Sequence, residues 1–225
     1  MASAIIGGML DSGFQAGDIW VSAPDDGHLQ SIRKRFGVSV TTDNRYCAQQ
    51  ADVVILAVKP QIIGDVMAGL KQAVGPQTLV LSIAAGISIA TLSAGLETGR
   101  VVRTMPNTPA QVGKGVTGAV AGPDVGTDDR AAIDALLSAA GQVAWFDAES
   151  DLDAVTAVSG SGPAYVFNLV EAMAAAGVKQ GLPEHVSMQL ARQTVIGAAA
   201  LMEADPAPAG VLRQNVTSPN GTTAA

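Results

Sequence analysis

The chain has 225 residues, of which 48% are hydrophobic and 15% are charged, and its formal net charge is −7. This composition is typical of a globular protein with enough apolar material for one large domain or two modest ones. The acidic balance excludes nucleic acid and anionic membranes as main partners, because both select basic surfaces, but it leaves local binding of small anions open.

The chain begins inside a predicted helix. A dinucleotide-binding domain opens with a strand and a Gly-x-Gly-x-x-Gly loop, and neither is present before the first helical residues. We therefore expect an α/β Rossmann-like domain whose first strand and glycine-rich loop are missing. Three explanations stay open: the chain is a fragment, it starts at an internal methionine, or it is a defective copy. A missing central strand would expose ladder groups and remove backbone donors for the pyrophosphate.

Short runs of β-branched and apolar residues alternate with helical or loop segments in the first part of the chain. They lie at residues 19–22, 38–40, 53–58, 79–83, 101–105, 116–121 and 143–146. This alternation is the pattern of βαβ units around a parallel sheet. The run 53–58 is apolar at every position, which predicts a central strand buried on both faces.

Ligands of an open parallel sheet bind beyond the carboxyl ends of its strands, so the loops that follow these runs should line one dinucleotide crevice. The predicted cofactor residues in these loops are Ala57, Val58, Lys59, Pro60, Ala84, Ala85 and Asn107. Ser22 ends an earlier strand, at the point where NAD-preferring domains carry an acidic residue. Its neutral side chain favours NADPH, although Asp25 and Asp26 follow closely and keep NADH possible.

Residues 72–96 contain no charge and are long enough to resemble a membrane span. We reject this interpretation, because prolines, glycines and serines divide the segment into a buried strand, a turn and a helix. We also expect a cytoplasmic protein. Cys47 is the only cysteine, no basic signal-peptide region follows Met1, and no histidine or cysteine spacing predicts a metal site.

Small residues interrupt a helical pattern at 153–165, where Ser159 and Ser161 alternate with two glycines before Pro163. Proline suits the first turn of a helix, so a new helix N-terminus is predicted here. Its free N–H groups and the two hydroxyls can hold an anion, but the same residues also make an ordinary helix start.

Helical spacing replaces the β-rich runs beyond about residue 149, which predicts one domain at 1–148 and a second at 149–225. The apolar stripes of the predicted helices are Val166, Leu169, Val170 and Met173, then Val186, Leu190, Gly197 and Leu201. Many alanines accompany these stripes and permit close helix contact. Since so short a helical unit lacks a core of its own, we expect it to pair with a second subunit.

Residues 216–223 combine a turn at 218–221 with two threonines at the expected start of a helix. Backbone N–H groups and hydroxyls converge there, which suits a substrate carboxylate. An N-capped surface turn is the alternative interpretation. The chain ends at Ala225, directly after this turn.

Three clusters of turn-forming and hydroxyl residues, at 105–109, 153–165 and 216–223, resemble one family in their residues and their order. Further matches lie at residues 57–61, 82–86 and 181–183. The chain resembles the pyrroline-5-carboxylate reductases over nearly its whole length. The resemblance implies a Rossmann-like domain followed by an all-α dimerisation domain. It also implies reduction of 1-pyrroline-5-carboxylate to L-proline by hydride transfer from NADPH or NADH.

The resemblance assigns the substrate to the predicted turn at 218–221 and the two threonines that follow it. Ser218 and the backbone at Gly221 and Thr222 would hold the substrate carboxylate, and the Thr223 hydroxyl would face the ring nitrogen. The family usually has a second glycine where this chain has Asn220, a residue that also tolerates a positive φ.

The resemblance also implies features of the cofactor side and of the assembly. Ala2 takes a position where close helix packing needs a small side chain, and Asn44 lies on the adenosine side. The helical half is an intertwined dimer in the family, rings of dimers occur, and the family chain continues for about one more helical hairpin.

Two other functions stay open. A related NAD(P)-dependent dehydrogenase of another substrate normally needs a lysine or histidine as acid and base, and Lys179 is the nearest candidate. A truncated, non-catalytic dimerising remnant would keep the helical interface without the phosphate loop. Reduction of an imine itself requires no strong acid or base, because positioning of the nicotinamide should dominate catalysis.

Overall fold

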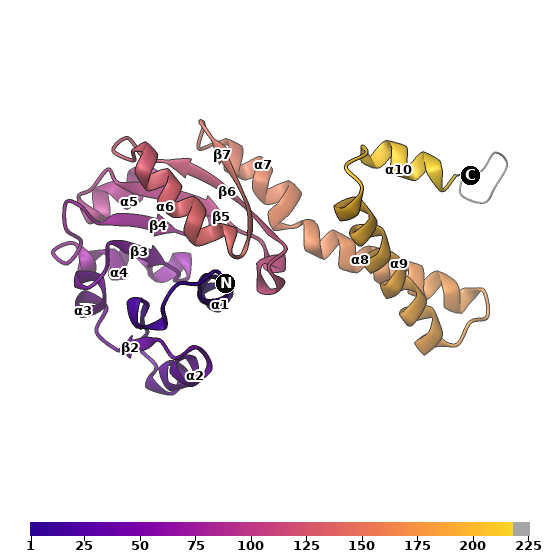
Figure 1. Cartoon of the computed structure of the whole chain (residues 1–225), viewed down its shortest axis with the longest axis horizontal. Helices are drawn as coiled ribbons and strands as arrows, with labels where there is room; N and C mark the ends of the chain where they lie inside the picture. The colour runs from indigo at the N-terminus through magenta and orange to yellow at the C-terminus, as the bar shows by residue number, and fades with distance from the viewer. Residues whose placement is uncertain (218–225) are drawn as a thin grey trace. The chain divides into compact units, whose positions relative to one another are not determined.

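Strand β4 (Leu79–Ser82) lies in the core of the first part of the structure, and each of its residues is buried. The computed structural model describes residues 1–217 (Figure 1). Residues 1–163 form one compact unit, and the described residues from Ala164 onward form a second.

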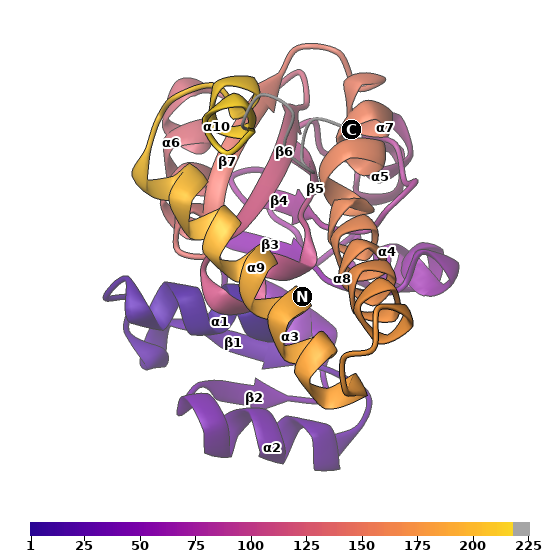
Figure 2. The ribbon, with the colours of Figure 1, turned by 90° about the vertical axis from the view of Figure 1, so that its right-hand side faces the viewer.

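The first unit contains seven strands in two sheets. β4 pairs in parallel with β3 (Val53–Leu56) and β5 (Val101–Met105), and β5 pairs antiparallel with β6 (Gly115–Ala121). β7 (Gly141–Phe146) completes a five-stranded sheet of order β3-β4-β5-β6-β7. β1 (Trp20–Ser22) and β2 (Ser39–Thr41) form a separate parallel pair, beside which α2 packs on β2 (Figure 2).

Helices cover both faces of the five-stranded sheet. The α-helices of the first unit are α1 (Ala2–Asp11), α2 (Asp26–Phe36), α3 (Asn44–Gln49), α4 (Ile63–Leu70), α5 (Ile89–Leu96), α6 (Thr127–Ser138) and α7 (Asp151–Val155). Leu79 and Leu81 pack with α1, α2 and α6, while Val80 packs with α3, α4 and α5. The alternation of side chains along β4 therefore divides the apolar residues between two cores.

Short helical turns connect several of these elements. They are the 3-10 turns η1 (Ala16–Asp18), η2 (Pro60–Ile62) and η3 (Thr108–Val112) and the π-helical turn η4 (Thr156–Gly160). The π turn joins α7 to α8 (Gly162–Lys179), so helical backbone runs almost without interruption from residue 151 to residue 179.

The fold confirms the predicted α/β Rossmann-like domain, and all seven predicted strands are present. The central position predicted for residues 53–58 is wrong, because β3 has a single neighbouring strand within residues 1–217. Its run is nevertheless apolar, since Val54 and Leu56 lie in one core while Val53 and Ile55 pack against the other. A single parallel sheet is also wrong for β6, because only a short connection with η3 separates it from β5, and parallel pairing needs a long crossover.

The second unit is helical, as predicted. α8 and α9 (Glu184–Ala204) pack through small buried residues, and the Ser187 hydroxyl donates a hydrogen bond to the Ala174 carbonyl at 2.6 Å. A Cβ at Gly177 would lie 2.0 Å from Ser187 Oγ, so the close approach requires glycine there. α10 (Ala209–Asn215) follows. No helix within the described residues is long and apolar enough to cross a membrane, and residues 72–96 form β4, a loop and α5 as predicted.

Arg100 and Asp129 join β5 to α6 by a half-buried ion pair, and Asp129 also accepts a hydrogen bond from the Gly126 N–H at 3.0 Å. The Arg100 hydrogen bond lowers the pKa of Asp129, which outweighs the opposing effect of burial. A carboxyl whose pKa is lower in the folded state stabilises the fold above its unfolded pKa, and this contribution is lost as the pH falls through the folded pKa.

We predict that Asp129→Asn lowers the free energy of unfolding by about 1–2 kcal/mol at neutral pH, because Arg100 loses its charged partner. The difference from the unsubstituted protein should shrink as the pH falls below the usual aspartate pKa of 3.8. Urea unfolding of both proteins between pH 7 and about pH 3 measures it. A difference that stays constant over this range would contradict the assignment.

Candidate active site

The loops that follow β3, β4 and β5 leave the sheet at one edge. The three strands are parallel, with Leu56 opposite Ser82 and Ser82 opposite Arg103. The loop residues predicted for the cofactor lie beyond this edge: Ala57, Val58, Lys59, Pro60, Ala84, Ala85 and Asn107. Ala57, Lys59 and Ala85 are exposed, and the two alanines leave the main chain open to a flat ligand.

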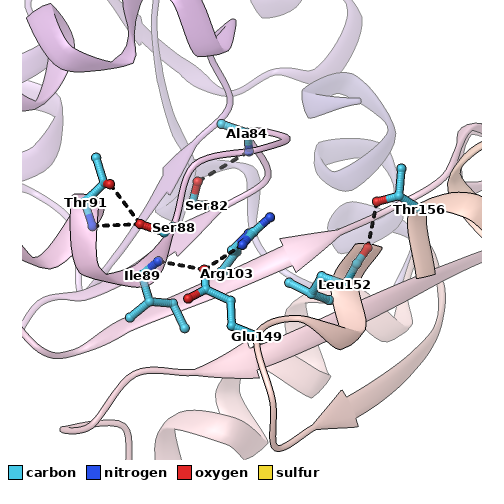
Figure 3. A network of polar contacts seen from close by, with 9 residues as sticks. All are labelled: Ser82, Ala84, Ser88, Ile89, Thr91, Arg103, Glu149, Leu152 and Thr156. Atoms are coloured by element: carbon cyan, nitrogen blue, oxygen red, sulfur yellow. Dashed lines mark hydrogen bonds and ion pairs between the residues drawn. The ribbon is translucent and has the colours of Figure 1, made fainter. Parts of the chain in front are cut away.

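Ser82 fixes the start of the loop after β4. Its buried Oγ accepts a hydrogen bond from the Ala84 N–H at 3.3 Å, and its carbonyl accepts one from Thr104 Oγ1 at 2.9 Å. Figure 3 shows Ser82 reaching back to Ala84 at the end of the strand. The loop therefore leaves the sheet in a fixed direction, and Ala85 and Gly86 are its first exposed residues.

Glu149 fixes the other end of the same loop. Its Oε1 accepts hydrogen bonds from the Ile89 N–H, the first of α5, at 2.8 Å and from Arg103 Nη1 at 2.6 Å. Ser88 Oγ also caps α5 by accepting from the Thr91 N–H at 3.1 Å. A carboxylate at a helix N-terminus complements the partial positive charge of the free N–H groups. Glu149 thus joins α5, β5 and the connection between β7 and α7 (Figure 3).

Neither Arg103 nor Glu149 was predicted from the sequence as a residue of the site. A charged residue within strand β5 was the available signal for Arg103, because a mostly buried arginine needs an anionic partner. No local pattern identifies that partner, since 46 residues separate Glu149 from Arg103.

Asn107 lies just beyond β5 and is only 8% exposed. Its Nδ2 donates a hydrogen bond to the Ser159 carbonyl at 3.2 Å, and its Oδ1 accepts one from the Val116 N–H at 2.9 Å. Both polar ends of the side-chain amide therefore have protein partners. A cofactor would therefore contact the backbone of Asn107 rather than its side chain.

Ser159 and Ser161 lie in and just after the π turn. The Ser159 hydroxyl donates to the Val155 carbonyl at 2.9 Å, and the Ser161 N–H donates to the Thr156 carbonyl at 2.8 Å. The predicted start of a helix is confirmed, because α8 begins at Gly162. The residues before it are also helical, and the Thr156 carbonyl accepts from the Ser161 N–H, so this N–H is not free to hold an anion.

Ser22 lies at the end of β1 and its side chain forms a hydrogen bond with the Cys47 thiol. Burial raises the pKa of Cys47, and the Ser22 bond partly opposes this shift, so the thiol stays protonated at neutral pH. Asp43 caps α3 by accepting from the Arg45 and Tyr46 N–H groups at 2.9 and 3.1 Å. Asn44 is exposed at the first position of α3.

Ala2 is the first residue of α1 and is half-buried. The closest helix packing of α1 comes later, at Gly8, where a Cβ would lie 2.7 Å from the Ala139 carbonyl oxygen. Four predicted substrate residues lie outside residues 1–217: Ser218, Gly221, Thr222 and Thr223. Within the described residues, no group of three or more His, Cys, Asp or Glu side chains is placed to hold a metal ion.

Two family models match the chain. The model described as "Pyrroline-5-carboxylate reductase dimerisation" matches residues 149–225, and the model "NADP oxidoreductase coenzyme F420-dependent" matches residues 1–86. The chain is 44% identical, over its whole length, to 83% of the pyrroline-5-carboxylate reductase of Pseudomonas aeruginosa. It is 40% identical, again over its whole length, to 83% of the Vibrio alginolyticus enzyme of the same name.

Solved structures give the same result. A pyrroline-5-carboxylate reductase from Coxiella burnetii matches 99% of this chain and 83% of its own, with a TM-score of 0.94 and 37% identity. The Plasmodium falciparum pyrroline carboxylate reductase, solved with NADP bound, matches 99% of this chain and 82% of its own, with a TM-score of 0.82 and 29% identity. These comparisons confirm the resemblance and the two-part fold that the sequence motifs predict.

We predict that Glu149→Gln lowers the free energy of unfolding by about 1–2 kcal/mol, because Arg103 then lies mostly buried without an anionic partner. Thermal unfolding should show a loss of about 2–8 °C for a chain of this size.

Glu97→Gln is the matched control, since the Glu97 pair with Lys71 is exposed, at 65% and 46% of the two side chains. An exposed pair contributes little, so this variant should unfold close to the temperature of the unsubstituted protein. Equal losses in the two variants would contradict the role of Glu149.

Proposed function

Because the chain belongs to the pyrroline-5-carboxylate reductase family, we propose that it reduces 1-pyrroline-5-carboxylate to L-proline, the last step of proline biosynthesis. The observation that carries this proposal is the 44% identity to the Pseudomonas aeruginosa enzyme along the whole chain. The NADP oxidoreductase model over residues 1–86 and the NADP bound to the Plasmodium relative support NADPH as the hydride donor. NADH is the alternative donor.

The reduced dinucleotide binds in the crevice beyond β3, β4 and β5. The exposed alanines of this edge suit the group, because they let a planar ring lie against the main chain. The proposed contact residues are Ala2, Ser22, Asn44, Ala57, Val58, Lys59, Pro60, Ala84, Ala85 and, through its backbone, Asn107. Ser22 carries no charge that would repel a 2′-phosphate, which favours NADPH.

The substrate carboxylate is held by Ser218 and by the backbone N–H groups of Gly221 and Thr222. This assignment rests on the turn and the two threonines in the sequence, which bring several donors to one point. Ser159 and Ser161 are proposed substrate residues as well. The Ser159 hydroxyl donates to the Val155 carbonyl, so it would meet the substrate as a hydrogen-bond acceptor, and the Ser161 hydroxyl is the group that can donate.

The reaction depends on positioning more than on acid–base catalysis. When bound, the nicotinamide would supply a hydride to the carbon of the imine in its N-protonated form. The nitrogen keeps that proton, and the C=N bond becomes the C–N bond of a secondary amine. The Thr223 hydroxyl holds the ring nitrogen by a hydrogen bond, which fixes the ring relative to the crevice. The donors of the turn neutralise the carboxylate.

The second unit forms a homodimer that completes each active site, and rings of dimers are the larger assembly of this proposal. The described faces of α8 and α9 expose a set of large apolar side chains: Tyr165, Phe167, Leu169, Leu190, Ile196, Leu201 and Met202. Apolar patches of this kind mark protein interfaces. The dimerisation model over residues 149–225 supports the same assignment.

The helical substrate and dimerisation domain begins at residue 149 in this proposal, and the nucleotide domain occupies residues 1–148. The family model starts at the same residue. α7 nevertheless packs against β5 and β6, which is why the first compact unit extends to Pro163. The segment 149–163 is therefore assigned to the dimerisation domain by sequence, although it packs with the nucleotide domain.

The proposed compartment is the cytoplasm. Cys47 is the only cysteine of the sequence, so the fold needs no disulfide. A reducing compartment suits a half-buried thiol of raised pKa.

We predict that Thr223→Ala in the full-length protein lowers kcat about tenfold to a hundredfold, because a hydrogen bond to the reacting nitrogen is lost. Pyrroline-5-carboxylate-dependent oxidation of NADPH measures the rate.

Thr217→Ala is the control, because the Thr217 hydroxyl already donates to the carbonyl of Arg213 in α10 at 2.8 Å. A Thr223→Ala rate equal to that of this control would remove Thr223 from the mechanism. Saturable NADPH binding by the unsubstituted protein distinguishes an enzyme from a dimerising remnant.

We predict that Leu190→Glu shifts the protein to monomers, since a carboxylate in an apolar interface costs several kcal/mol unless it is paired. Sedimentation velocity measures the assembly, and the rate of NADPH oxidation should fall with dissociation. Ala132→Glu, on the exposed face of α6, is the control and should leave the assembly intact. An unchanged sedimentation coefficient for Leu190→Glu would exclude this face from the interface.

A further inference from the structure

Pro163 removes a hydrogen bond from the helical run that joins α7 to α8. In an α-helix, the Ser159 carbonyl would accept from the N–H of the residue four positions later. That residue is Pro163, which has no N–H and whose ring crowds the same carbonyl. The local sequence therefore leaves the Ser159 carbonyl without its helical donor. The π turn at Thr156–Gly160 falls at this point.

Asn107 supplies the missing donor from a distant part of the chain. Its Nδ2 lies 3.2 Å from the Ser159 carbonyl oxygen, and its Oδ1 accepts from the Val116 N–H at 2.9 Å. These two bonds fix the orientation of the amide, because the opposite orientation would place two acceptors and two donors against each other. The side chain thus ties the π turn to the end of β5 and the start of β6.

Packing at the same place leaves little room for the turn to move. A Cβ at Gly160 would lie 2.8 Å from Met105 Cε, so the turn lies directly against the last residue of β5. A Cβ at Gly118 would lie 2.8 Å from Val155 Cγ1, which shows equally close packing between α7 and β6. Asn107 is the polar contact within this packed region, and it is almost completely buried.

We propose that Asn107 is a positioning residue, which holds the Ser159 carbonyl in place of the N–H that Pro163 lacks and so sets the position of the Ser159–Ser161 segment beside the crevice. This inference rests on the proposed function, in which Ser159 and Ser161 face the substrate. The side-chain amide of Asn107 orients the segment that faces the substrate and does not contact the cofactor. Loss of the amide donor therefore weakens substrate binding while NADPH binding is retained.

Asn107→Asp in the full-length protein tests this role. Aspartate keeps the shape and the acceptor for the Val116 N–H, but it turns the donor to Ser159 into an acceptor. We expect the KM for pyrroline-5-carboxylate to rise about tenfold, because a buried carbonyl is left without a donor, while the dissociation constant for NADPH changes less than about twofold. Gln142→Glu, which likewise replaces an amide by a carboxylate but at an exposed position of β7, is the matched control.

Pro163→Ala gives a rescue experiment, because alanine returns an N–H to the position that the Ser159 carbonyl needs. The double variant Asn107→Asp, Pro163→Ala should recover most of the lost substrate affinity and unfold at a higher temperature than Asn107→Asp alone. A double variant no better than the single variant would overturn the proposal, and so would a tenfold weaker NADPH affinity with an unchanged KM for the imine.

The unfolding data separate this inference from the proposed function. A double-mutant cycle between positions 107 and 163, with Pro163→Ala as the second single variant, measures their coupling without any assay of activity. If the unsubstituted protein does not reduce pyrroline-5-carboxylate, the proposed function fails. If the cycle shows no coupling, the positioning role of Asn107 fails whatever the activity is.

Discussion

The parallel pairing of β3, β4 and β5 is the constraint on which the rest of the first unit depends. Parallel strands require crossovers, and α4 and α5 make them on one face, where they share a core with Val80 and Val101. α1, α2 and α6 cover the other face, against Leu79 and Leu81. Since the three strands end at one edge, their loops are brought together there. Open parallel sheets bind ligands beyond the carboxyl ends of their strands, so this edge is the position expected for a dinucleotide.

Local signals predicted much of this arrangement. Runs of β-branched residues located the seven strands, because this pattern depends only on neighbouring residues. The position of β3 and the direction of β6 were not predicted correctly. The apolar sequence of β3 shows that both of its faces are buried, but it does not show how many strands pair with it. A strand with one neighbour is equally apolar when helices cover both of its faces. Direction depends on the length of the connection, and η3 is too short a connection for a parallel return.

The candidate site was predictable only in part, since its loops follow from strand ends but its long-range partners do not. Glu149, which follows β7 in the sequence, bonds Arg103 and the Ile89 N–H. Asn107 bonds the carbonyl of Ser159, which lies 52 residues later in the chain. A helical pattern broken by glycines and a proline looks like a new helix start when it is read alone. In the structure, the Ser161 N–H donates to the Thr156 carbonyl, five residues earlier, so the backbone before α8 is also helical. Such π-type hydrogen bonds are rare, and no local sequence rule predicts them.

The π turn and its asparagine explain how a proline can stay inside a helical run that links the two domains. An interior proline costs about 3 kcal/mol or more when it leaves a carbonyl unbonded. The Asn107 amide offsets part of this cost by bonding the orphaned Ser159 carbonyl, and it does so from the strand end that borders the crevice. The irregularity is thereby confined to one fixed place. In a regular helix, the N–H of residue 163 would bond the Ser159 carbonyl, and the carbonyl would not need Asn107 as a donor. Because Pro163 lacks that N–H, the Ser159 carbonyl is bonded by Asn107, which lies at the end of β5 beside the crevice.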